Sequence, residues 1–125
     1  SWTMPFTPPS NDDCDDAISL TVNTDQSCSN VTSGTISGAT ASSQEDDVTG
    51  TPNNDVWFSF TATGTDHRVS LSGIVNQGGG TSTSTDMGMG VYDATGGCDG
   101  LVLVGDSDPE ELSLSNLTPS KTYLI

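Results

Sequence analysis

The chain is 125 residues long, which corresponds to a single domain that can fold on its own. Its 17 acidic and 2 basic residues give a formal net charge of -15 at pH 7. Nucleic acids and anionic membrane surfaces are therefore excluded as expected partners, because their phosphates would be repelled. The same charge favours divalent cations, cationic partners or neutral polymers. No apolar run approaches the roughly 18 residues that a membrane span needs.

The first ten residues are predicted to form a leader or linker. Pro5, Pro8 and Pro9 lie within residues 1–10 and cannot donate to a continuous hydrogen-bonded ladder. We therefore place the folded domain at residues 11–125.

Two stretches follow the leader. Ile18, Leu20 and Val22 alternate within residues 17–22, and this period of two predicts the first strand. Residues 31–41 are rich in Thr and are interrupted by glycines, which predicts a pair of short or bulged strand pieces.

The densest aromatic run in the chain predicts its central strand, at residues 55–61. β-branched and aromatic residues bounded by turn residues are typical of a buried strand. Alternation places Val56, Phe58 and Phe60 on one face, with Asp55, Trp57, Ser59 and Thr61 on the other.

The second half of the chain repeats the strand pattern. Residues 67–73 are predicted to pair with the central strand as a hairpin, and residues 74–85 are predicted to form a long loop. Further strands are expected at residues 86–93, 101–106, 112–114 and 121–125. About eight short strands with no helical period predict an all-β fold, a jelly-roll-like antiparallel β-sandwich.

The order of five short motifs resembles a known bacterial family. The motifs are Asn11-Asp12-Asp13-Cys14 before Ala17-Ile18, then residues 55–61, then 67–71, then Val91-Tyr92 before Cys98-Asp99-Gly100-Leu101, and finally Leu117-Thr118-Pro119 before residues 122–125. Together they resemble the pre-peptidase C-terminal (PPC-like) domain, in the variant repeated in secreted and cell-surface proteins of Bacteroidetes.

The resemblance implies a β-sandwich that accompanies secreted proteases, glycosidases and adhesins without being their catalytic unit. Members usually carry a second cysteine shortly after the counterpart of Cys98, where this chain has Gly105-Asp106. They also continue past the strand of Tyr123 into a last strand, so the resemblance implies a domain that lacks this strand and has an open sheet edge.

The three cysteines predict an oxidising, extracytoplasmic compartment. Cys14 and Cys28 flank the first predicted strand and are expected to form a disulfide. Cys98 is then left as a buried thiol, or as the partner of a cysteine elsewhere.

The acidic cluster before the first strand is a candidate calcium site, because hard cations prefer several oxygen ligands. Related domains of some collagenases bind calcium near the linker that enters the sandwich, which the resemblance carries to this stretch. The alternative is a cluster that caps turns through side-chain bonds to the backbone. The predicted ligands are Asn11, Asp12, Asp13, Asp15 and Asp86.

Trp57 and Tyr92 are candidate ligand-binding residues, because each alternates out of phase with the apolar residues of its strand. On a solvated sheet face they could stack on sugar rings. The competing interpretation is a second layer of core.

A single histidine, His67, and carboxylates confined to turns predict no enzyme. We expect a non-catalytic, extracellular module of a secreted bacterial surface protein that acts in adhesion or in attachment to polysaccharide or protein polymer. One alternative is a subunit of an extracellular filament completed by a strand from a neighbouring chain. Another is an accessory domain of a secreted protease or glycosidase.

Overall fold

The computed structural model describes residues 7–44, 48–49, 54–75 and 86–125, and it confirms an all-β sandwich. Seven strands lie within the described residues, against about eight expected. None of the described helices is long and apolar enough to cross a membrane.

In chain order the elements are η1 (Cys14–Asp16), β1 (Ile18–Ser19), β2 (Phe58–Thr61), β3 (His67–Ser70), β4 (Met89–Asp93), η3 (Cys98–Gly100), β5 (Val102–Ser107), β6 (Glu111–Leu114) and β7 (Thr122–Leu124).

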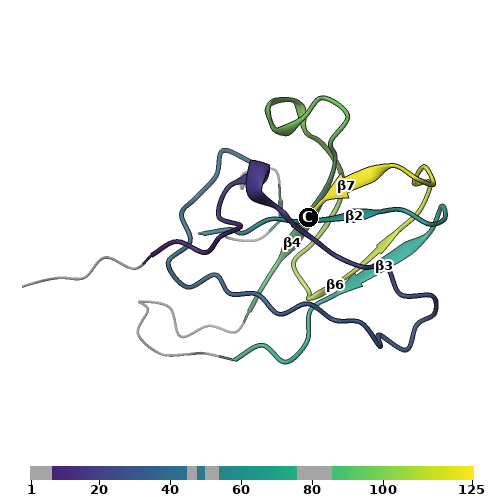
Figure 1. The fold of residues 1–125 in the computed structure, drawn as a ribbon, viewed down its shortest axis with the longest axis horizontal. Helices are drawn as coiled ribbons and strands as arrows, with labels where there is room; N and C mark the ends of the chain where they lie inside the picture. Colours follow the sequence, from purple (N-terminus) through teal and green to yellow (C-terminus); the bar gives the residue numbers. More distant parts are fainter. Residues whose placement is uncertain (1–6, 45–47, 50–53, 76–85) are drawn as a thin grey trace, which may run out of the picture.

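The strands form two sheets (Figure 1). The larger, sheet A, has the order β1-β2-β7-β4-β5, and the smaller, sheet B, consists of β3 and β6. β1 runs parallel to β2, whereas every other pair is antiparallel. β7 therefore occupies the middle of sheet A, between β2 and β4.

The inner face of sheet A packs against sheet B. Val91 is fully buried at the centre of this core. Phe60 and Tyr123 are cross-strand partners whose rings stack with centroids 5.7 Å apart. The core cluster consists of Phe60, Ala62, Met89, Val91, Leu112, Leu114, Leu117 and Tyr123.

The outer face of sheet A is buried as well, under irregular chain instead of a second sheet. Its cluster contains Trp57, Tyr92 and Leu124, packed against residues of η1, η3 and the segments beside them. Because both faces are covered, four successive residues of β4, from Met89 to Tyr92, are buried.

The alternation predicted around β2 is confirmed, but its position and its hairpin are wrong. β2 lies between β1 and β7 and is not the central strand. The strand that follows it, β3, pairs with β6 in sheet B. The chain changes sheets at the turn between them, where the backbone N–H groups of Thr63 and Gly64 both donate to Nε2 of His67.

The strand pieces predicted at residues 31–41 are absent from the structure. This segment is irregular, and Gly34 lies so close to Phe58 that a Cβ atom there would come within 2.7 Å of the ring. Gly34 therefore allows this segment to pack closely against Phe58 of β2, and the segment does not pair with β2 as a strand. The predicted loop at 74–85 and the predicted leader at 1–10 fall largely outside the described residues.

Candidate functional site

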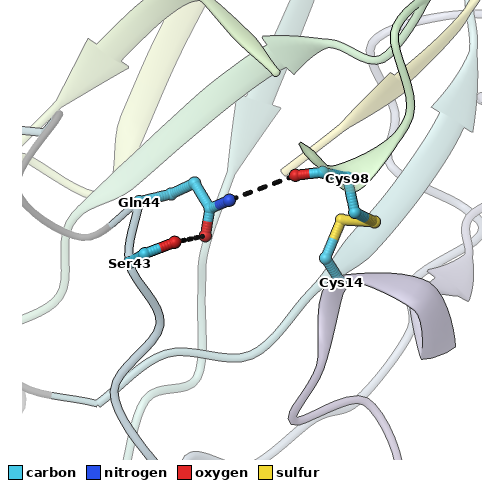
Figure 2. Close-up of a disulfide and its surroundings, with 4 residues drawn as sticks. All are labelled: Cys14, Ser43, Gln44 and Cys98. Carbon is cyan, nitrogen blue, oxygen red and sulfur yellow. Dashed lines mark hydrogen bonds between the residues drawn. A yellow bond between two sulfur atoms is a disulfide. The ribbon is translucent and has the colours of Figure 1, made fainter. Parts of the chain in front are cut away.

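A disulfide joins Cys14 to Cys98 across 84 residues of sequence, with Cα atoms 5.9 Å apart (Figure 2). It links η1 to η3 over the outer face of sheet A, where both cysteines pack against the Trp57 cluster. Gln44 reinforces the junction, since its Nε2 donates to the carbonyl of Cys98 at 3.2 Å.

The predicted bond between Cys14 and Cys28 is wrong. Cys28 is exposed and free, in a turn with a positive φ of 54°. The chain after β4 folds back over the outer face and brings Cys98 to η1. Nearness in sequence was therefore a poor guide to the partner of Cys14.

Trp57 and Tyr92 lie together on one face, as predicted, but the prediction of a sugar-stacking surface is wrong. Each ring is only 3% exposed, and their centroids are 5.8 Å apart. The hydroxyl of Tyr92 donates to the carbonyl of Gln44 at 3.0 Å. The two rings form a second layer of core, which was the competing interpretation of the sequence pattern.

Two polar atoms in this layer have no hydrogen-bond partner among the residues that the structure describes. They are Nε1 of Trp57, a donor, and Oδ1 of Asp55, an acceptor, and both are buried. Residues two apart on extended chain share a face, so both side chains belong to the outer face of sheet A. The other oxygen of Asp55 accepts from the hydroxyl of Ser42. Buried polar groups are rarely left without a hydrogen bond, so these two atoms are an exception within the outer face of sheet A.

The first two members of the predicted calcium site have structural partners. Asn11 is buried, and its Nδ2 donates to the carbonyl of Trp57 at 2.8 Å. The carboxylate of Asp12 accepts from the backbone N–H of Thr40 at 2.6 Å and from its hydroxyl at 2.7 Å. Both residues therefore fasten the chain before β1 to the rest of the domain.

The other predicted ligands do not complete a metal centre. Asp13 is the N-cap residue of η1 but makes no side-chain capping hydrogen bond, Asp15 lies within η1, and Asp86 is exposed three residues before β4. Among the described residues, no group of three or more His, Cys, Asp or Glu side chains is placed to hold a metal ion. The donor set as described does not fit calcium, and the ion remains a prediction from sequence.

Several carboxylates are held in the ionised form by hydrogen bonds. Lys121, followed by Thr95, lowers the pKa of Asp93 to about 2. The Thr49 hydroxyl and backbone N–H lower the pKa of Asp106, and the backbone N–H of Met87 lowers that of Glu110. At neutral pH these carboxylates accept hydrogen bonds from side chains and backbone N–H groups of neighbouring segments.

The two sides of β7 are paired over different lengths. β7 pairs with β2 from Thr122 as far as Ile125, which exchanges hydrogen bonds with Phe58 at 2.8 and 2.9 Å. It pairs with β4 only at Tyr92 and Asp93. Among the described residues, Met89–Val91 pair only with β5.

The backbone directions follow from this register. Alternate residues of a strand send their N–H and C=O groups to the same side. Because Tyr92 faces β7, Gly90 also faces that side, and because Phe58 faces β7, so does Val56.

Comparison with known proteins gave no match to a family model, a curated protein or a solved structure. The resemblance to the PPC-like domain accordingly remains an expectation from the motifs alone.

Proposed function

We propose that this chain is a non-catalytic module of a secreted bacterial surface protein, and that it attaches to other extracellular polypeptides. The observation that carries the proposal is the edge strand β5 of sheet A, which among the described residues pairs only with β4 and exposes Val102 and Val104. Pairing of an added strand with an exposed sheet edge is a common mode of peptide recognition.

The disulfide between Cys14 and Cys98 supports an extracytoplasmic location, because such bonds persist in oxidising compartments. The disulfide also links η1, before β1, covalently to η3, after β4. A mechanical force applied to the N-terminal part of the chain is therefore transmitted to sheet A through this bond.

A non-catalytic role is supported by the use of the ionisable side chains. The imidazole Nε2 of His67 accepts two backbone N–H groups, and Asp93 is paired with Lys121. Among the described residues, the recess beside β1, lined in part by Pro9, Asn11 and Gly34, has no ionisable side chain in its wall. His67 and Asp93 are therefore engaged in structural contacts and are not arranged as a general base and a general acid.

Polysaccharide is the weaker partner in this proposal, since the two aromatic rings that suggested it are buried. Sedimentation of the disulfide-bonded chain with insoluble protein fibres, and separately with cellulose, chitin and xylan, tests the choice. Retention by protein fibres is expected. Retention by the polysaccharides alone would contradict the proposal.

A further inference from the structure

We infer that His67 makes one corner of the sandwich sensitive to mild acid. The neutral imidazole holds the turn between β2 and β3, and protonation of the ring releases this turn. The corner lies where the chain leaves sheet A and enters sheet B. The inference is independent of the proposed attachment to polypeptides, because it concerns the response of the fold itself to acid.

The hydrogen bonds of the ring require its neutral form. Nε2 of His67 lies 3.1 Å from the backbone nitrogen of Thr63 and 3.3 Å from that of Gly64, and it accepts a hydrogen bond from both. A ring nitrogen that accepts carries no proton, so the proton of the neutral ring is on Nδ1. A protonated imidazole carries an N–H on both nitrogens and has no acceptor left. The two N–H groups of the turn then face a third donor.

The side chains that meet the ring are apolar. β2 contributes Phe60, whose ring centroid is 5.6 Å from that of the imidazole. β6 contributes Leu114, the cross-strand partner of His67 in sheet B. An imidazolium gains no counter-ion from either of these side chains.

The charged groups of the surrounding elements are engaged elsewhere. Asp66, the residue before His67, is exposed and forms no ion pair with the imidazole. Among the residues that the structure describes, the ion pairs join other groups: Arg68 of β3 to Glu111 of β6, and Lys121, just before β7, to Asp93 of β4. No ion pair with a described carboxylate therefore replaces the two hydrogen bonds that the ring loses on protonation.

The same turn supports a second crossing between the sheets. Residues 115–121 lead from β6 of sheet B to β7 of sheet A and lie beside the β2–β3 turn (Figure 1). The N–H of Ala62 donates to the carbonyl of Lys121 at 2.9 Å, and the carbonyl of Ala62 accepts from Ser120 at 2.7 Å. The N–H of Leu117 donates to the carbonyl of Thr65 at 2.9 Å. Release of the β2–β3 turn therefore loosens two crossings at this end of the sandwich.

The experiment follows the disulfide-bonded chain by heteronuclear NMR between about pH 7.5 and about pH 5.5, where histidine usually changes charge and ordinary carboxylates stay ionised. At the upper end, Nε2 of His67 is expected to be unprotonated. As the ring takes up a proton, the protection of the Thr63 and Gly64 N–H groups should fall about five- to tenfold, the effect of about one net hydrogen bond. Protection is referred to the intrinsic exchange rate at each pH. The N–H of Leu20, which donates to Ser59 within sheet A, is the internal control and should keep its protection.

Two substitutions separate the acceptor from the proton. His67→Gln places an amide oxygen near the position of Nε2 and does not titrate, so the turn should stay protected and lose its pH dependence. His67→Phe keeps an aromatic ring beside Phe60 but supplies no acceptor. In this variant the turn should be weakly protected at both ends of the window.

Four results overturn the inference. The first is a proton on Nε2 at the upper end of the window. The second is unchanged protection of Thr63 and Gly64 while the ring titrates. The third is the same pH dependence in His67→Gln, which would assign the titration to another group. The fourth is an equal loss of protection at Leu20, which would make the response global. None of these results bears on retention by protein fibres, so the proposed function is tested separately.

Discussion

The indole ring of Trp57 packs against the phenol ring of Tyr92 at 5.8 Å, at an interplanar angle of 47°, beneath the Cys14–Cys98 junction. This contact makes the outer face of sheet A a second hydrophobic core. Replacing Trp57 with Ala is therefore expected to lower the free energy of unfolding by about 3–5 kcal/mol, the usual cost of such a truncation.

Denaturant unfolding followed by circular dichroism measures this loss. Val31→Ala is the matched control, because Val31 is 76% exposed and its truncation should change stability by less than about 0.5 kcal/mol. A Trp57→Ala variant as stable as this control would show that the ring does not belong to the core.

The disulfide is expected to contribute about 4.5 kcal/mol, because it closes a loop across 84 residues of sequence in the unfolded chain. The double substitution of Cys14 and Cys98 by Ser should lower stability by this amount and remove its sensitivity to reductant. Cys28→Ser should change neither property, since Cys28 is exposed and free. Loss of stability in the Cys28 variant would contradict the observed pairing.

Sequence alone predicted the parts of the fold that depend on local pattern. Alternation assigned Phe60 and Trp57 to opposite faces of one strand, and both lie buried on those faces. What alternation could not supply was the partner of each strand or the number of covered faces. An unbroken apolar run such as Val56–Phe58 is the expected signature of a strand covered on both sides.

The candidate site was harder to predict, because it depends on contacts distant in sequence. Cys14 is bonded to Cys98 across 84 residues, and Asp12 bonds to Thr40 across 28 residues. Such pairings follow from topology and leave no local trace. A run of Asn and Asp therefore suggested a metal, although the Asn11 side chain donates a structural hydrogen bond and the Asp12 carboxylate accepts one.

Asp12 allows the calcium prediction to be tested. Asp12→Ala removes two hydrogen bonds to Thr40 and is expected to lower stability by about 1–3 kcal/mol, equally in millimolar calcium and in chelator. Thermal melts of both proteins in both buffers give the comparison. If the substitution mattered only in calcium, Asp12 would have to be a metal ligand.

Acid is expected to weaken the domain through Asp93. Its pKa in the folded chain is lowered to about 2 from its ordinary value of 3.8 by Lys121 and Thr95. A depressed pKa stabilises the folded state above the unfolded pKa, and this contribution is lost as the pH falls from about 4 to about 2. Asp93→Asn should flatten the pH dependence of stability in this window. An unchanged slope in the Asp93→Asn variant would contradict this role of the carboxylate.

Gly90 tests how closely the outer face of sheet A is packed along β4. A Cβ atom there would meet Cγ1 of Val48 at 2.5 Å and side-chain carbons of Leu103 and Tyr92 at 3.4 Å. Gly90→Ala is therefore expected to lower the free energy of unfolding by about 1–3 kcal/mol, the range for an overpacked core. At Gly64 a Cβ would meet nothing within 4 Å, so Gly64→Ala should be neutral or slightly stabilising. Chemical unfolding measures the stability of both variants. Equal stabilities would contradict the close packing, because they would mean that Val48 moves aside at little cost in free energy.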